Sequence, residues 1–69
     1  MNTEAQRDSL LYVKDLAEWL DRSESAVHWL VHSGRAPRSA KLAGRRVFRE
    51  SDVRAWIEEA FADEEKESV

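Results

Sequence analysis

The sequence contains no cysteine, and it has only two glycines and one proline. Without cysteine there is no disulfide framework and no thiolate metal site, so stability must come from packing, and a reducing compartment is expected. No apolar run approaches the length of a membrane-spanning helix, and the opening residues lack the apolar stretch of a secretion signal. We therefore expect a cytoplasmic protein that has no membrane partner.

Acidic residues are missing from one stretch of an otherwise acidic chain. The 69 residues carry a formal net charge of -3, yet no aspartate or glutamate lies between Arg35 and Arg49. The basic residues of this stretch are Arg35, Arg38, Lys41, Arg45, Arg46 and Arg49. Screening at physiological salt acts over roughly 8 Å, so a distant acidic segment would not hide this stretch from a ligand. The stretch is therefore a candidate site for a polyanion.

Motifs of catalysis are also absent. The chain has no glycine-rich phosphate loop, no Gly-x-Ser-x-Gly elbow and no cysteine nucleophile, so we expect neither enzymatic activity nor a cofactor. A chain of this length builds one small core, because only about 60% of its unfolded surface is buried on folding. We expect a flexible segment over residues 1–9, one domain over residues 10–61 and a disordered acidic tail over residues 62–69.

Three segments have the apolar spacing of amphipathic helices, namely residues 13–20, 23–34 and 51–61. Ser23 and Ser51 are predicted to cap the second and third helices, and Gly34 provides a left-handed end to the second. The short connection of the first two helices is typical of a helix-turn-helix. In the third helix, the residues expected to face the core are Val53, Trp56, Ile57, Ala60 and Phe61.

Between the second and third helices the apolar spacing changes to that of strands. Residues 39–43 and 45–49 flank Gly44 and predict a hairpin. Alternation along the second strand directs Phe48 to the core and leaves Val47 exposed or facing a partner. Residues 10–12 are a candidate third strand. The predicted fold class is therefore mainly α with a small β-hairpin, a winged helix-turn-helix with three helices and a two- to three-stranded sheet.

Three stretches carry a more specific signal: LLYVKDLAEWL, SESAVHWLVHSGRAP and KLAGRRVFRESDVRAWIEE. Over residues 10–59 they resemble the small excisionase-type DNA-binding domains of the MerR-like winged-helix superfamily. The resemblance implies a second helix in the DNA major groove and a hairpin wing in the neighbouring minor groove. It also implies either a recombination directionality factor of a phage or mobile element or a small transcriptional regulator.

Partners and location follow from the same resemblance. Double-stranded DNA is the expected partner, together with a recombinase or RNA polymerase. A module this small contacts few base pairs, so cooperative self-association on repeated DNA sites is expected as well. The protein would then be associated with the nucleoid.

Two groups of residues are candidates for DNA contact. Basic side chains on a projecting hairpin gain from counterion release, and narrow minor grooves attract arginine in particular. The group on the hairpin and its flanks is Arg22, Arg35, Arg38, Lys41, Gly44, Arg45, Arg46 and Arg49. Hydroxyl and imidazole groups can bond bases or phosphates, and an indole can cover a thymine methyl. The group on the second helix is Ser23, Ser25, His28, Trp29 and His32.

The second helix leaves an alternative open, because it contains neither arginine nor lysine. The face that carries His28 and Trp29, flanked by Glu24, could contact a protein instead, which would make the chain an adaptor. Trp29 could also pack sideways against the hairpin. Glu24, His28 and His32 lie along one helical ridge, but they lack an evident fourth ligand, so no metal site is expected.

The basic stretch has an alternative interpretation too. Acidic residues of the third helix could neutralise it as a solvated loop. Those residues are Glu50, Asp52, Glu58 and Glu59. Arg49 in particular could serve only to pair with Asp52 at the start of that helix.

Overall fold

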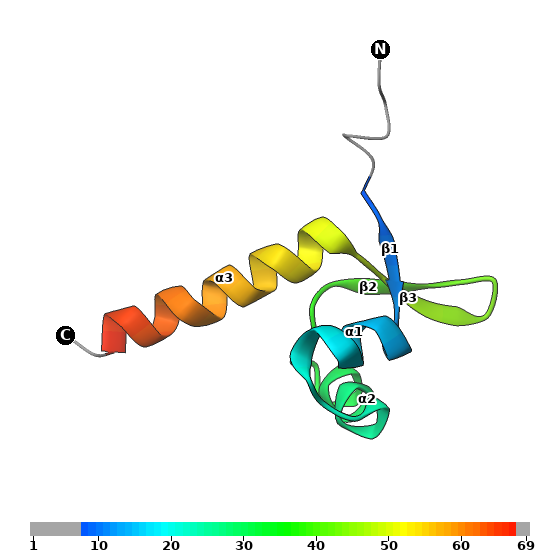
Figure 1. Ribbon diagram of the computed structural model, residues 1–69, viewed down its shortest axis with the longest axis horizontal. Helices are drawn as coiled ribbons and strands as arrows, with labels where there is room; N and C mark the ends of the chain where they lie inside the picture. The colour runs from blue at the N-terminus through cyan, green and yellow to red at the C-terminus, as the bar shows by residue number, and fades with distance from the viewer. Residues whose placement is uncertain (1–7, 68–69) are drawn as a thin grey trace, which may run out of the picture.

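A computed structural model describes residues 8–67, which form three helices and three strands. In chain order these are β1 (Leu10–Tyr12), α1 (Val13–Leu20), α2 (Glu24–His32), β2 (Ser39–Leu42), β3 (Arg45–Arg49) and α3 (Glu50–Glu67). Both β1 and β2 pair antiparallel with β3, which is the central strand. The hairpin of β2 and β3 projects to one side, and α3 runs away from it (Figure 1). The predicted winged helix-turn-helix fold is confirmed, and so is the third strand.

The turn between α1 and α2 is fixed by local hydrogen bonds. Asp21 ends α1 in the left-handed region, with φ 55°, and the Arg22 amide donates to the Ala17 carbonyl over 2.9 Å. The Ser23 hydroxyl accepts a hydrogen bond from the Ala26 amide over 3.1 Å, as the sequence predicts for the cap of the second helix. Gly34 ends the helical segment with φ 77°, a conformation that glycine adopts without a steric penalty.

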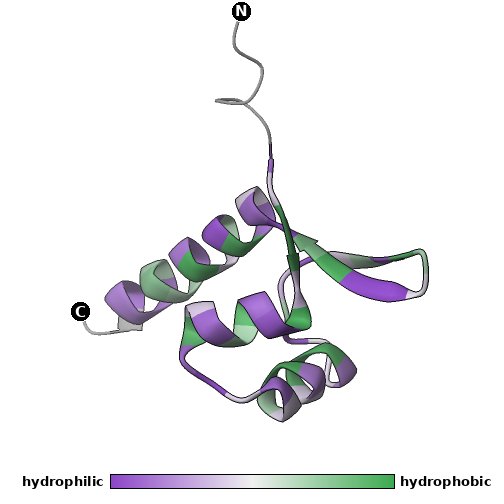
Figure 2. Cartoon of the chain, turned by 45° about the vertical axis from the view of Figure 1, so that its right-hand side comes forward, coloured by the Kyte–Doolittle hydropathy of each residue, from purple (hydrophilic) through white to green (hydrophobic). Residues whose placement is uncertain are grey.

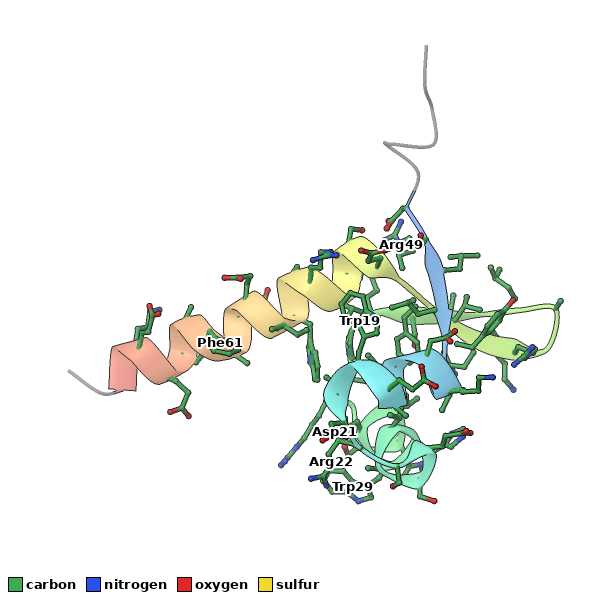
Figure 3. All side chains as sticks on the ribbon, viewed as in Figure 1. Trp19, Asp21, Arg22, Trp29, Arg49 and Phe61 are labelled. Carbon is green, nitrogen blue, oxygen red and sulfur yellow. The ribbon has the colours of Figure 1, made fainter. Side chains whose placement is uncertain are left out.

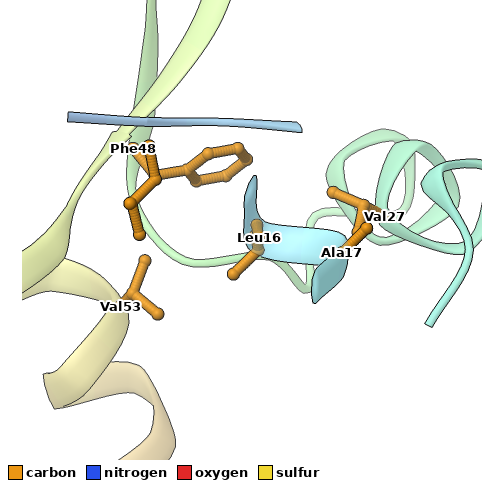
Figure 4. Packing of buried hydrophobic residues seen from close by; sticks show 6 residues of the cluster. Leu16, Ala17, Val27, Phe48 and Val53 are labelled. Atoms are coloured by element: carbon orange, nitrogen blue, oxygen red, sulfur yellow. The ribbon is translucent and has the colours of Figure 1, made fainter. Parts of the chain in front are cut away.

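One core joins the two helices of the turn to the sheet and to α3 (Figure 4). Its largest fully buried side chains are Leu16 of α1, Val27 of α2, Phe48 of β3 and Val53 of α3. Burying each of these contributes about 1.5–3 kcal/mol relative to an exposed side chain. Because each comes from a different element, this core fixes the orientation of α2 relative to the hairpin.

Val47 differs from the prediction, because it is buried at 5% exposure rather than exposed. It lies on the central strand opposite Tyr12 of β1 and Ala40 of β2. Neighbours on both sides therefore cover it, although it points away from the face that carries Phe48. A pattern of alternation along one strand cannot predict this cover, which comes from the two flanking strands.

The third helix also differs from the prediction. It continues to Glu67, so residues 62–67, expected as a disordered tail, are helical. Polar and apolar residues alternate along it as far as residue 62, and residues 63–67 are all charged (Figure 2). Only the first part of its apolar stripe meets the core: Val53 is buried, Ile57 is partly buried, and Ala60 and Phe61 are exposed. The expectation that all five stripe residues face the core is therefore wrong.

Trp56 lies at the edge of the core rather than within it. Its side chain is half-buried, and the indole Nε1–H donates to the Arg35 carbonyl over 2.9 Å. The exit from α2 is therefore tied to α3 by a hydrogen bond between residues 21 positions apart. No helix within residues 8–67 is both long enough and apolar enough to cross a membrane.

The start of α3 is capped from a distance. The predicted N-cap, Ser51, is already within the helix, and its amide and hydroxyl donate to the Asp8 carboxylate over 2.9 and 2.6 Å. The Glu50 amide donates to the Ser9 carbonyl over 2.8 Å. Residues 8 and 9, expected within a flexible segment, are therefore bound to α3. The rest of that segment, residues 1–7, and residues 68–69 lie outside the described part of the chain.

This cap predicts a pH dependence of stability. The hydrogen bonds from Ser51 hold the pKa of Asp8 below its ordinary value. A carboxylate whose pKa is lower in the folded state contributes stability above the unfolded pKa, about 3.9, and loses it as the pH falls through the folded pKa. We expect Asp8→Asn to lower the thermal unfolding midpoint at neutral pH, and the difference from wild type to shrink as the pH falls below 4.

The control for this prediction is Asp63→Asn, because Asp63 is an exposed carboxylate on α3 itself. The control should change the midpoint little at any pH. A difference between wild type and Asp8→Asn that stays constant from neutral to acid pH would contradict the assigned cap.

Candidate nucleic-acid interface

A groove lies between α2 and the start of β3, close to the turn of the hairpin. It has a volume of about 310 Å³, and it brings together residues from β1, α1, α2 and β3. Its lining residues are Tyr12, Val13, Lys14, Glu24, His28, Arg45 and Arg46. Three of these side chains are cationic, and the groove runs beside the exposed face of α2. Residues of both predicted groups meet in this groove, His28 from α2 and Arg45 and Arg46 from the hairpin.

Arg45 and Arg46 are held in place by contacts that leave their charge unneutralised. The Arg45 guanidinium lies 4.1 Å from the centre of the Tyr12 ring, in a cation–π contact. Arg46 Nη1 donates to the Ser39 hydroxyl over 3.2 Å. Among the described side chains, neither arginine forms an ion pair with a carboxylate. Both charges are therefore positioned by the fold and remain available to an anion.

The face of α2 that points away from the core is exposed, as predicted, and its exposed side chains are Ser25, His28, Trp29 and His32. Ser23 lies at the end of this face, where its hydroxyl already accepts the capping hydrogen bond. Glu24 and His28 lie on the side of the hairpin, within the groove. The helix therefore offers hydrogen-bonding side chains to a ligand, and one carboxylate beside them.

Trp29 lies on the other side of α2. Its side chain is 56% exposed, and it lies beside Arg22, well away from Arg49 (Figure 3). The Arg35 guanidinium is 5.7 Å from its ring centre. Together with Arg22, Ala26 and Leu30 it lines a shallow depression of about 340 Å³. The indole therefore does not pack against the hairpin.

The remaining basic residues of the stretch are not part of the groove. Arg38 and Arg49 line a second groove on the outer side of the sheet. Arg49 Nε donates to Asp52 over 2.7 Å, and this hydrogen bond raises the pKa of the guanidinium. Lys41 is exposed on β2 opposite Arg46. Gly44 has φ 81° in the turn of the hairpin, as its predicted role requires.

Among the described residues, the carboxylates of α3 form an ion pair with one residue of the basic stretch, Arg49. Asp52 pairs with Arg49, whereas Glu50 pairs with Arg54 of its own helix. The other cations of the stretch form no ion pair within residues 8–67. No group of three potential metal ligands comes together in that part of the chain, so Glu24, His28 and His32 do not converge.

Three residues that line the groove were missed by sequence reasoning, namely Tyr12, Val13 and Lys14. The position of Lys14 beside Arg45 and Arg46 depends on the pairing of β1 with β3, which places the start of α1 next to the hairpin. The sequence of residues 10–20 does not indicate which residues of β3 pair with β1.

The fold and the groove together define a small winged helix-turn-helix protein with a cationic groove beside its second helix. Residues 10–60 match the family of helix-turn-helix domains, and the chain belongs to that family. Helix-turn-helix domains are DNA-binding domains, and they are typically not enzymes. No curated protein and no solved structure matches the chain.

Proposed function

We propose that the protein binds double-stranded DNA sequence-specifically, with α2 in the major groove and the hairpin of β2 and β3 against the adjacent minor groove. One observation carries the proposal: Arg45 and Arg46 lie across a groove from the exposed face of α2 and form no ion pair with the described carboxylates. Duplex DNA carries about one negative charge per 1.7 Å of its axis, so such cations release counterions on binding.

The side chains around the groove make two kinds of contact with DNA in this proposal. Arg45, Arg46 and Lys14 contact phosphates and the minor groove, which contributes affinity and fixes orientation. Ser25, His28 and His32 hydrogen-bond to base edges or to phosphates in the major groove. Among the flanking residues, Arg22 and Arg35 supply further phosphate contacts, and Lys41 extends the basic surface along the hairpin. Arg38 and Arg49 are secondary, because they line the outer groove.

The proposed biological role is that of an excisionase-like recombination directionality factor or a small transcriptional regulator. A single module of this size buries too little surface to select one site in a genome. Several copies on repeated sites, bending the DNA beside a recombinase or RNA polymerase, would supply the missing specificity. We expect the protein to act in the cytoplasm, in association with the nucleoid.

A second candidate function is favoured by Trp29. Its side chain is 56% exposed beside a shallow depression, and aromatic residues are enriched in protein interfaces. In this alternative the Trp29 and His28 face of α2 binds a protein, and the chain acts as an adaptor.

Selection of bound duplexes from a pool of random sequences distinguishes the two candidates. The proposed function predicts enrichment of a short motif, with Trp29→Ala altering the enriched sequence or weakening binding to it. The adaptor predicts no enrichment of any sequence at low salt, whether or not Trp29 is present. Circular dichroism of the Trp29→Ala variant verifies that it is folded, as expected for so exposed a side chain.

Glu24 provides a test of the groove itself. Its carboxylate lines the same groove as Arg45 and Arg46 and would face the phosphates of bound DNA. Removal of one exposed like charge is worth up to about 1 kcal/mol. We therefore expect Glu24→Gln to raise the affinity for random-sequence DNA by about threefold to fivefold at low salt, measured by fluorescence anisotropy.

The matched control is Glu59→Gln, which removes the same charge from an exposed position on α3. It should leave the affinity nearly unchanged. Equal effects of the two substitutions would mean that the groove does not face the phosphates.

A further inference from the structure

The outer side of the sheet carries a second groove, separate from the groove beside α2. Its volume is about 270 Å³, and it shares no lining residue with the groove beside α2. Its lining residues are Leu10, Arg38, Ser39, Ala40, Leu42, Val47, Arg49 and Asp52. Strand register explains its apolar floor: Val47 is opposite Ala40, and the neighbouring pairs contribute Leu10 and Leu42. Leu10 and Leu42 are 48% and 51% exposed.

A complementary surface lies on the distal half of α3. Val53, Ile57 and Phe61 recur every fourth residue, so they form one stripe. Val53 is in the core, whereas Phe61 is 65% exposed on the part of α3 that projects beyond the body (Figure 3). Exposed carboxylates flank the ring at positions three residues before and after it, Glu58 and Glu64. This half of α3 is therefore an apolar ring set among negative charges.

We propose that Phe61 of one copy of this chain docks in the outer sheet groove of a second copy. The two surfaces match in polarity, because Phe61 meets the apolar floor formed by Leu42 and its neighbours. They also match in charge, because Arg38 at the rim forms no ion pair within residues 8–67 and would meet Glu58 or Glu64.

The contact joins different copies, because α3 leaves the sheet at the end of β3 and runs away from the hairpin (Figure 1). The ring therefore cannot reach the groove of its own chain. An interface between two different surfaces of one protein is head-to-tail, and it extends into chains unless the rotation closes a ring. Each copy would keep its cationic groove accessible.

This contact would be the surface through which copies associate on repeated DNA sites, as proposed above. The test of the contact uses the protein without DNA. If the two copies did not associate, the proposal of DNA binding would be unaffected. If the protein did not bind DNA, the proposed contact between copies would be equally unaffected. The contact is small, so the association should be weak and visible only towards millimolar protein concentration.

The test uses two variants that each block one surface, Phe61→Asp and Leu42→Asp. Both positions are more than half exposed, so the domain should fold, which circular dichroism verifies. Sedimentation equilibrium of the wild type should show a mass that rises with concentration, while each variant alone stays monomeric. Mixed in equal amounts, the variants should form dimers and nothing larger, because each retains one intact surface. Phe61→Ala should weaken the association of the wild type at least about tenfold.

Three results would overturn the proposal. The first is a wild type that remains monomeric at millimolar concentration, which would assign both surfaces to a different partner. The second is a Leu42→Asp variant that associates as well as the wild type, which would indicate a symmetric contact between two copies of Phe61. The third is a mixture that stays monomeric. The exposed-aromatic control, Trp29→Ala, should associate like the wild type.

Discussion

The double variant Arg45→Ala, Arg46→Ala is expected to bind DNA about 100-fold more weakly than the wild type at low salt. Each guanidinium would lose a charge-assisted contact with a phosphate or a minor groove, and each such contact contributes about 1.5 kcal/mol, or about tenfold. The dependence of log affinity on log salt should also become shallower by about two, since two fewer counterions are released. Titration of a labelled duplex at several salt concentrations measures both effects.

The matched control removes two cations from α3 instead, with Arg54→Ala and Lys66→Ala. These positions are exposed and do not line the groove beside α2. Net charge changes equally in the two double variants, so any difference between them reports position rather than charge. An equal loss of affinity in both would show that binding is a diffuse attraction, and it would refute the assignment of the groove.

Phe48→Ala is expected to leave the protein only marginally stable at room temperature. The ring is fully buried on the central strand and belongs to the same core as Leu16 and Val53. Truncation of a buried phenylalanine costs about 3–5 kcal/mol, and a domain of this size has a total stability of roughly 5 kcal/mol. Urea denaturation followed by circular dichroism should therefore show little or no folded baseline.

The other phenylalanine of the chain is the natural control. Phe61→Ala removes the same atoms from a 65% exposed position on α3, so its free energy of unfolding should change by no more than about 0.5 kcal/mol. If the two variants had similar denaturation midpoints, the assignment of Phe48 to the centre of the core would be wrong.

Much of the fold could be predicted from local patterns. The helices α1 and α2 follow from apolar spacing, and the boundaries of α2 follow from Ser23 and Gly34, whose capping and left-handed roles depend only on adjacent residues. The hairpin follows from Gly44 between two strand-like runs. These features share one property: the interactions that determine them lie within a few residues of sequence.

The features that were predicted wrongly depend on interactions between residues far apart in the sequence or on where the core ends. Asp8 caps α3 from 43 positions away, so the nearer Ser51 looked like the better cap. Val47 is covered by two flanking strands whose register no single strand reveals. Phe61 continues an apolar stripe past the end of the core, and a helical pattern does not indicate where the core stops.

The sequence indicated some of the residues that line the groove, but not how they are arranged. Sequence grouped all the basic residues of the stretch together, whereas the structure separates Arg45 and Arg46 beside α2 from Arg38 and Arg49 on the outer groove. Lys14 joins the first pair because β1 pairs with β3. Charge density along a chain indicates a polyanion partner, but strand pairing decides which charges act together.

The salt dependence of DNA binding by the wild-type protein tests the central claim most directly. If Arg45, Arg46 and their neighbours rest against phosphates, log affinity should fall linearly with log salt, with a slope of about -3 to -5. A slope near zero, or no binding to any duplex at about 50 mM salt, would contradict the claim that this cationic groove is built for DNA.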